Sequence, residues 1–373
     1  MKTIQKYILF SLIGLSAVAC KDDQEELGGG EKVEVTFTTE VQTRALTNVT
    51  TDIEKDGETM NVFVLESSSI TSGQKVPTYQ ATRQSGSWKS NPALELTSGQ
   101  KKYLRAFYPY SANIGTPDAI AIEINSQTDY LYTGTAVQAT YEKPSVKLTL
   151  KHALPILAFN IKKENYDGEG KLEQITIEGK NFYTQGTLNI ASGEIKGSTQ
   201  EKFSITCNNT LSAEGWKEDM PDMFCIPFTS SGSDVNVTFK IDGKNYTCPL
   251  PKYGIAQGVK YIFRAAMTAK GITIFDAPEL VSLNSDNDDM SQFSYGMLRI
   301  THNSLTFTPP TFSGLNITGN IDWGDGKTEI YSTAAQHEYE NDGEKTVTLE
   351  MWGAEEVTLP KLTGVTEIDL TEF

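Results

Sequence analysis

Short runs in which apolar and polar residues alternate follow one another along most of the chain. Val33, Val35 and Phe37 alternate with polar residues, and the same pattern extends over residues 235–241. A period of two is typical of a β-strand with one buried face. Asp-Gly at 242–243 separates two alternating runs and therefore predicts a tight β-hairpin. Gly, Ser, Asn and Pro separate the runs and no long helical pattern stands out, so the sequence predicts an all-β protein built of β-sandwiches.

One strand pattern changes phase along its length. Leu148, Leu150 and His152 share one parity, whereas the apolar residues from Leu157 onward share the other. The change falls near Pro155 and predicts a bulge or an edge kink. His152 then faces the core together with the leucines. We expect a buried histidine that is hydrogen-bonded to the backbone, rather than a catalyst or a metal ligand.

The N-terminus has the pattern of an export signal. Residues 1–6 include two lysines, and residues 7–18 are apolar or small. A stretch of about a dozen such residues is shorter than the roughly 20 that a spanning helix needs, so it predicts a signal peptide. It ends in Ala17-Val18-Ala19-Cys20, which resembles the cleavage box of bacterial lipoproteins and predicts lipid attachment at Cys20. The alternative is an ordinary signal peptide followed by a chance cysteine.

A charged, glycine-ending run occupies residues 20–30 and predicts a flexible tether. Lys21-Asp22-Asp23 directly after the cysteine resembles the surface-export signal of lipoproteins in anaerobic Gram-negative bacteria. Two or three acyl chains would make the anchor stable. We therefore expect a lipid-anchored protein of the outer membrane that faces the cell exterior.

Charge and composition exclude several classes of partner. The chain has 373 residues and a formal net charge of −16 at pH 7. Nucleic acid and anionic lipid surfaces would repel such a chain. With three His and four Cys, a His-rich or Cys-rich metal centre is hard to build.

The sequence contains no convincing catalytic or cofactor motif. The acidic run that begins at Asn284 lacks the Gly and the Glu of a calcium loop, and a solvated linker explains it better. Gly326-Lys327-Thr328 lacks the first Gly of a phosphate loop, and no helical pattern follows it. We therefore expect no cofactor, no metal and no enzymatic activity. A carboxylate pair of the glycosidase type is left open, because acidic residues are plentiful.

Three cysteines remain after lipidation, namely Cys207, Cys225 and Cys248. Cys225 and Cys248 occupy apolar positions in predicted strands, which favours small buried side chains. A disulfide between Cys207 and either of the others stays an alternative, because the export route permits it.

Several segments, in this order and spacing, resemble the fimbrillin family. The segments that carry the resemblance are Val33–Phe37, Thr43-Arg44-Ala45, Phe107–Ser111, Leu148–Ile161 and Gly258–Phe263. The resemblance implies two tandem β-sandwiches of transthyretin-like topology and a lipidated precursor.

The resemblance also implies a route of assembly. In pilus-building members a protease cuts after an Arg near the first strand, and a C-terminal strand of the next subunit fills the groove that opens. Arg44 and Ala45 match the processing site, and Val33, Val35 and Phe37 match the displaced strand. The alternative is that Arg44 is a surface residue that is never cut.

The last part of the chain departs from this family. Ile321–Gly326 and His337–Tyr339 resemble a domain of the polycystic-kidney-disease (PKD) type, a small immunoglobulin-like sandwich. That resemblance implies structural roles in turns and hydrogen bonds for Asp322, Asp325 and His337, and a packed Trp323. Residues 359–373 match a closing strand or a donor strand equally well.

Six segments follow from these patterns. They are a signal peptide (1–19), a tether (20–30), an N-terminal β-sandwich (31–143), a second β-sandwich (144–272), a linker (273–290) and a PKD-like domain (291–373).

The function implied is a non-enzymatic surface lipoprotein of the fimbrillin type, acting as a minor, tip or anchor subunit of a fimbria or as an adhesin. Its expected partners are other fimbrial subunits, the outer membrane through the lipid anchor, and a host or bacterial surface protein or glycan, but no nucleic acid. The alternative is a surface glycan-binding lipoprotein of a polysaccharide-uptake system, although no cluster is evident among Trp88, Trp216, Trp323 and Trp352. A hydrolase with cryptic carboxylates is the third hypothesis.

Overall fold

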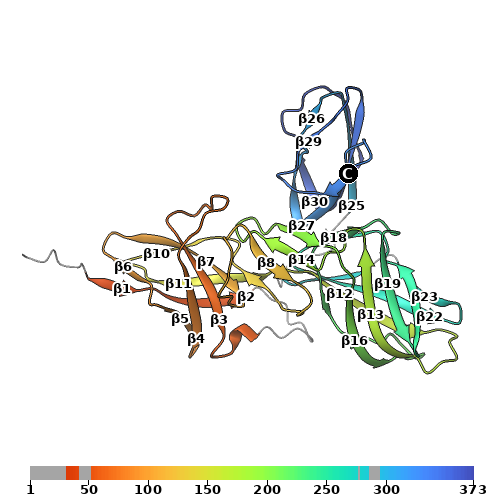
Figure 1. Ribbon diagram of the computed structural model, residues 1–373, viewed down its shortest axis with the longest axis horizontal. Helices are drawn as coiled ribbons and strands as arrows, with labels where there is room; N and C mark the ends of the chain where they lie inside the picture. Colours follow the sequence, from red (N-terminus) through yellow and green to blue (C-terminus); the bar gives the residue numbers. More distant parts are fainter. Residues whose placement is uncertain (1–30, 42–51, 276–277, 285–294) are drawn as a thin grey trace, which may run out of the picture.

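The computed structural model describes residues 31–41, 52–275, 278–284 and 295–373, and β-strands dominate it (Figure 1). The one helical element in these ranges is the short 3-10 turn η1 (Asp52–Glu54). No helix in the described part of the chain has the length and apolar character needed to cross a membrane. The all-β prediction is confirmed.

The first unit is built on one large sheet. Its strands, in their order across the sheet, are β10 (Val137–Thr140), β7 (Lys101–Tyr108), β3 (Thr59–Leu65), β4 (Thr78–Gln84), β5 (Ser87–Asn91), β2 (Thr36–Val41), β11 (Ser145–His152) and β9 (Leu131–Tyr132). β9 also pairs with β7 at Phe107↔Tyr132 and Tyr108↔Leu131. The strands from β7 round to β9 therefore close into a barrel, an arrangement that removes free strand edges.

β11 belongs to this barrel and not to the second unit. It pairs with β2 in parallel and with β9 antiparallel. The boundary predicted between residues 143 and 144 therefore falls before a strand of the first unit. The pairing moves it to residues 153–155, where the chain leaves one sheet for another. The phase change near Pro155 marks this crossing rather than a bulge within one strand.

The second unit is a sandwich of two sheets (Figure 1). One sheet contains β17 (Met223–Phe224), β12 (Ile156–Lys163), β22 (Val259–Thr268) and β23 (Gly271–Ile274), with β24 (Glu279–Ser282) also on β22. The other contains β16 (Phe203–Thr210), β13 (Lys171–Gly179), β19 (Val235–Ile241) and β20 (Lys244–Pro249). Between the sheets, Phe159 lies edge-on to Phe239 with ring centroids 5.3 Å apart. The predicted hairpin joins β19 to β20, and positive φ at Asp242 and Gly243 fits its two-residue turn.

The interval predicted as a linker, residues 273–290, contains strand structure. β23 pairs with one half of β22 and β24 with the other half. Asn284 accepts a hydrogen bond from the backbone N–H of His152 at 2.6 Å and donates to its carbonyl at 3.3 Å. The start of the acidic run is thus held against the first unit instead of being a solvated linker.

The first two units share one apolar core. β8 (Ile120–Glu123) comes from the first half of the chain but pairs with β14 (Gln185–Leu188), which pairs in turn with β15 (Ile195–Thr199). Phe107, Ile122 and Tyr130 pack in the same cluster as the second sandwich. A separate cluster that includes Phe37 and Trp88 fills the barrel. The two units therefore form one continuous body. A small sheet of β1 (Lys32–Glu34) and β6 (Glu95–Thr97) completes the first.

The C-terminal domain stands away from the long axis of the other two units (Figure 1). Its main sheet runs β28 (Thr328–Ile330), β27 (Thr311–Asp322), β30 (Lys345–Thr358), β25 (Tyr295–His302) and β31 (Val365–Glu372), and a second sheet pairs β26 (Thr306–Phe307) with β29 (His337–Glu338). Trp323 packs in a core of its own with Leu298 and Val347. The domain contacts the second unit at β18 (Phe228–Ser230) and β21 (Tyr253–Ile255).

A buried arginine joins loops of both units. Arg105 donates to the carbonyls of Gly134 at 2.7 Å, Ile190 at 3.1 Å and Ser68 at 3.2 Å. Burial lowers its pKa from the ordinary value. The sequence does not reveal this arrangement, because the carbonyls come from three distant loops.

We expect Arg105→Met to lower the free energy of unfolding by at least about 2 kcal/mol, because buried carbonyls would lose their donor. Chemical denaturation followed by tryptophan fluorescence measures the change. Arg264→Met, at an exposed arginine, is the control and should alter stability by less than about 1 kcal/mol. Equal effects of the two substitutions would contradict the joining role of Arg105.

Candidate assembly site

The segment 32–41 lies with one face inside the first barrel. Val35 and Phe37 are fully buried, and Val33 is half-buried. Burial of the Val35 and Phe37 side chains contributes roughly 3 to 6 kcal/mol to holding the segment. The alternation seen in the sequence thus corresponds to an inner and an outer face.

The segment is bound unequally by its two neighbours in the barrel. β2 and β11 pair in parallel over six residues, from Thr36↔Ser145 to Val41↔Leu150. On the other side, the pairing with β5 is confined to Phe37↔Trp88. Trp88 adds a hydrogen bond from Nε1 to Thr39 Oγ1 at 2.9 Å. β2 is therefore held by burial of its apolar face and by its pairing with β11, whereas its pairing with β5 is short.

Surface ion pairs hold both ends of the segment. Lys32 Nζ lies 2.9 Å from Glu95 on β6, and Glu40 lies 2.6 Å from Lys147 Nζ on β11. All four side chains are largely exposed, so each pair contributes at most about 1 kcal/mol. If the segment left, Trp88 and the inner face of β11 would lose their cover, and β11 would gain an unpaired edge. Such a groove can accept another strand.

The predicted processing and lipidation residues lie outside the described residues. Cys20 precedes the described part, and Arg44 and Ala45 fall in the gap between β2 and η1. Arg44 follows the last residue of β2 by three positions. A cut there would separate β1 and β2 from the rest of the chain.

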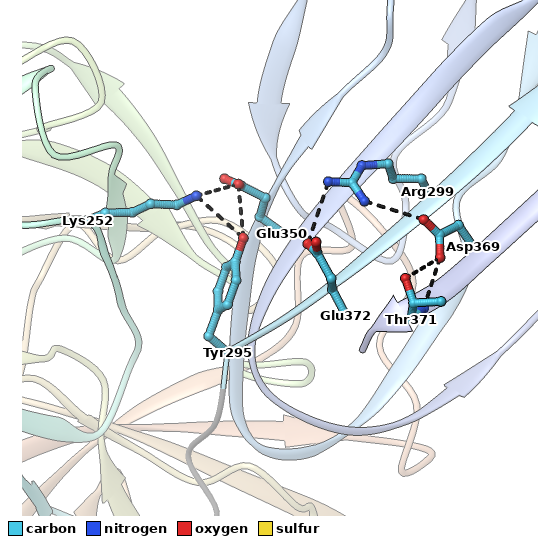
Figure 2. Close-up of polar contacts among 7 residues, drawn as sticks. All are labelled: Lys252, Tyr295, Arg299, Glu350, Asp369, Thr371 and Glu372. Atoms are coloured by element: carbon cyan, nitrogen blue, oxygen red, sulfur yellow. Dashed lines mark hydrogen bonds and ion pairs between the residues drawn. The ribbon is translucent and has the colours of Figure 1, made fainter.

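The strand β31 lies at the edge of the C-terminal sheet and, among the described residues, pairs with β25 alone. Arg299 on β25 reaches Asp369 at 3.4 Å and Glu372 at 3.5 Å (Figure 2). Its large apolar side chains are exposed to an unusual extent: 37% for Ile368, 43% for Leu370 and, just beyond it, 37% for Phe373. β31 thus has a free edge and little burial, as expected of either a closing strand or a donor strand.

A polar cluster fixes the C-terminal domain to the second unit (Figure 2). Lys252 lies 2.6 Å from Glu350, and the Tyr295 hydroxyl donates to the same carboxylate at 3.1 Å. Burial would lower the pKa of Lys252, but the hydrogen bond and charge of Glu350 raise it above the ordinary value. Beneath the cluster, Gly254 lies so close to Trp352 that a Cβ would come within 2.7 Å of the indole ring. The joint is therefore tightly packed. Nothing in the local sequence pattern indicates this contact.

Asp322 is the last residue of β27, Asp325 lies in the turn that precedes β28, and His337 reaches this turn from β29. Asp322 accepts from the backbone N–H of Gly324 at 2.9 Å, and His337 Nε2 lies 2.9 Å from Asp325. The hydrogen bond from His337 lowers the pKa of Asp325. No group of three or more His, Cys, Asp or Glu that could hold a metal ion occurs in the described ranges.

A buried hydrogen-bonded chain that the sequence did not point out crosses the C-terminal core. The backbone N–H of Ser304 donates to His302 Nδ1, His302 Nε2 lies 3.3 Å from the Tyr339 hydroxyl, and that hydroxyl donates to the Trp323 carbonyl at 2.9 Å. This direction requires a neutral imidazole with its proton on Nε2. The parity that His302 shares with buried Leu298 and Ile300 could have revealed its burial.

His152 is buried as expected, but its ring has a different partner. Nδ1 lies 2.8 Å from Asp129 Oδ1, so a carboxylate takes the place of the expected backbone group. Nε2 has no hydrogen-bond partner among the described residues. Asp129 lies 23 positions earlier in the chain, and nothing in the local pattern indicates this pair.

The three described cysteines are free, buried thiols, which confirms the preferred interpretation. Burial raises the pKa of Cys207 and Cys248 to about 11 and raises that of Cys225 as well. At neutral pH these thiols are protonated and unreactive.

The tryptophans do not form a common platform for a ligand. Trp88, Trp323 and Trp352 are buried. Trp216 is half-buried, and Lys162 and Arg264 lie over its ring at 4.5 and 5.6 Å from the centroid. The ring of Trp216, the most accessible of the four indoles, is thus already covered by two cationic side chains.

Comparison with known proteins gives one family and a set of similar folds. The family model described as Fimbrillin-like matches residues 43–278, which covers most of both β units but neither the segment 32–41 nor the C-terminal domain. No curated protein matches the chain. The fold is similar to a crystal structure of a cell adhesion protein from Bacteroides uniformis, at 16% identity and a TM-score of 0.50, over 67% of this chain and 97% of that one.

Other solved structures are also similar in fold. A fimbrial protein from Bacteroides vulgatus has 15% identity and a TM-score of 0.49, over 66% of this chain and 99% of that one. The C-terminally truncated tip fimbrial protein Mfa3 from Porphyromonas gingivalis has 12% identity and a TM-score of 0.41, over 68% of this chain and 100% of that one. At these identities the likeness concerns the fold alone.

The buried imidazole makes the stability of the C-terminal domain depend on pH. Burial lowers the pKa of His302. The unfolded chain, with a pKa of about 6.5, therefore takes up a proton at a pH where the folded domain does not. The stabilisation from His302 is full above about pH 6.5 and is lost as the pH falls through the lower, folded pKa. We expect the melting temperature to fall between about pH 7.5 and about pH 5.5, and to fall less in His302→Gln. The same pH dependence in both proteins, measured by circular dichroism, would show that His302 is not the group responsible.

Proposed function

The chain belongs to the fimbrillin-like family, and on this basis we propose that it is a non-enzymatic cell-surface protein, a minor, tip or anchor subunit of a fimbria or an adhesin. The proposal rests on the way in which the segment 32–41 is bound in the barrel. Val35 and Phe37 fill the barrel, whereas β5 pairs with β2 at a single position. A segment held in this way can be replaced by a strand of another subunit without refolding the barrel.

The route that we propose has two steps. A protease that recognises Arg cuts between Arg44 and Ala45, and the segment that contains Val33, Val35 and Phe37 leaves the barrel. A strand from a second subunit then covers Trp88 and pairs with β11. Apolar burial and backbone hydrogen bonds both favour occupation of the open groove.

The same proposal includes the anchor. Cys20 carries the lipid, residues 20–30 form the tether, and the protein is held at the outer membrane with its β units outside. The Lys-Asp-Asp run after Cys20 supports surface export.

The C-terminal domain favours a terminal place in the fimbria. It follows the two family-matched units at the point where a shaft subunit would present its donor strand. We propose that β31 serves as the donor, since it pairs with one neighbour and exposes Ile368 and Leu370.

The processing step predicts a new N-terminus. Protein recovered from the cell surface should begin at Ala45 and form a ladder of heat-sensitive oligomers on unboiled gels, whereas Arg44→Ala should keep the longer chain and migrate as a monomer. N-terminal sequencing and intact mass establish both points. A wild-type chain that still begins at acylated Cys20 and migrates as a monomer would rule out assembly by strand exchange.

The donor role of β31 predicts a separation of stability from assembly. Ile368→Thr with Leu370→Thr should abolish the heat-sensitive oligomers, because these side chains would enter the groove of the next subunit. The monomer should lose less than about 1 kcal/mol per substitution, because both side chains are already well exposed. Leu305→Thr, at another exposed leucine of the same domain, is the control. Oligomers that persist in the double variant would assign β31 the role of a closing strand.

A further inference from the structure

A groove of about 550 Å³ lies between the second unit and the C-terminal domain. One wall consists of Asn181, Tyr183 and residues 194–197, and the other of residues 328–332 and 334–336. Its volume is in the range of small-molecule sites, about 300 to 1,000 Å³. No part of the assembly route described above uses this groove.

The walls of the groove are strand edges. β15 ends the order β15-β14-β8, and β28 ends the order of the C-terminal sheet. Consecutive residues of each strand line the groove, whereas a wall made by a sheet face would contribute alternate residues. Ser332 donates to Glu194 Oε1 across the groove at 2.7 Å and ties the two walls together. The groove is therefore formed by the way in which the second unit and the C-terminal domain pack against each other.

Polar side chains line this space. The side chains of Asn181, Glu329 and Gln336 line the groove, and the carboxylate of Glu329 interacts electrostatically with His337. Together they offer two amides, which both donate and accept, and one carboxylate, which accepts. Desolvation raises the pKa of Glu329 above its ordinary value, while the residue as a whole is exposed.

Two tyrosines provide flat apolar surfaces, one on each wall. Tyr183 lies against Gly197, where a Cβ would come within 2.3 Å of the ring, so only glycine permits this position. Tyr331 lies edge-on to Phe312 at 5.2 Å and donates its hydroxyl to the Pro310 carbonyl. Both rings are half-buried and held in place before any ligand arrives.

This combination fits a sugar better than other ligands. Sugar rings present C–H faces that pack on aromatic rings, and hydroxyls that pair with amides and carboxylates. Glu194 and Glu329 outnumber Lys196 in the lining, which disfavours an acidic glycan. A peptide strand would need a longer edge than the three residues of β28.

We propose that the groove between β15 and β28 binds an uncharged oligosaccharide, with Tyr183 and Tyr331 against its ring faces and Asn181, Glu329 and Gln336 on its hydroxyls. The proposal deepens the adhesin role and rests on it, since it names the class of ligand that the surface protein would hold.

The test is affinity electrophoresis of the full-length protein through gels that contain laminarin, xylan, mannan or arabinogalactan, with polygalacturonate as the acidic comparison. We expect retardation by at least one neutral polysaccharide. We expect the affinity for that polysaccharide to fall about tenfold or more in Glu329→Gln, and separately in the double variant Asn181→Ala with Gln336→Ala. A loss of this size is the effect of losing hydrogen bonds to a ligand. Glu344→Gln and Asn341→Ala, at exposed positions outside the groove, are matched controls and should leave the affinity unchanged.

The outcomes separate this inference from the proposed function. Absence of retardation by every neutral polysaccharide, or retardation that the groove variants leave unchanged, overturns the saccharide site. Retardation by polygalacturonate alone overturns the uncharged class. If the groove variants abolish the heat-sensitive oligomers instead, the groove accepts a protein strand and the proposal is wrong. Assembly is measured on a separate, unboiled gel through the loss of oligomers in Arg44→Ala. The assembly proposal can therefore fail while the saccharide proposal holds, and the reverse is also possible.

Discussion

The barrel of the first unit is closed only while a strand lies between β5 and β11. Closure between β7 and β9 is made by the pairs Phe107↔Tyr132 and Tyr108↔Leu131 and does not involve β2. The strand at the β5–β11 position comes from the N-terminal part of the described chain, so the first segment of the fold completes this sheet. The core around Trp88 and the pairing of β11 both depend on that position being filled.

Many contacts hold the rest of the molecule in place around the position of β2. The second sandwich shares its core with the first unit, β8 pairs with β14 across their boundary, and Arg105 donates to carbonyls from both. Asn284 holds the end of β11 in place through the backbone of His152. The C-terminal domain adds a packed joint at Gly254 and Trp352. An exchange of β2 would therefore be a local event in a body that is otherwise held at many points.

Local pattern was enough to predict the strand class, the hairpin at 242–243, the inner face of the first segment and the burial of the cysteines. These features depend on parity and on turn residues a few positions apart. Long-range pairing was not accessible in this way. The assignment of β11 to the first barrel depends on a partner more than 100 residues away, and the strand at 279–282 stands in a run whose acidic composition suggested a linker. The same distinction between local pattern and long-range contact holds for the residues of the candidate site. The apolar face of the segment 32–41 was visible in the sequence, whereas the Asp129 partner of His152, the Lys252–Glu350 contact and the groove beside β28 arise only when distant elements meet.

The parallel pairing of β2 with β11 also has a mechanical meaning. In the lipid-anchored precursor that we propose, a pull from the membrane enters the fold at Lys32, the first residue of β1, and passes directly into β2. When the pull is directed along β2, the ladder between Thr36–Val41 and Ser145–Leu150 is loaded in shear, so its bonds share the force and must yield together. A pull across the strand would open the same bonds one after another. The direction of tension on the tether would then decide whether the precursor resists flow as an intact barrel or releases its first strand.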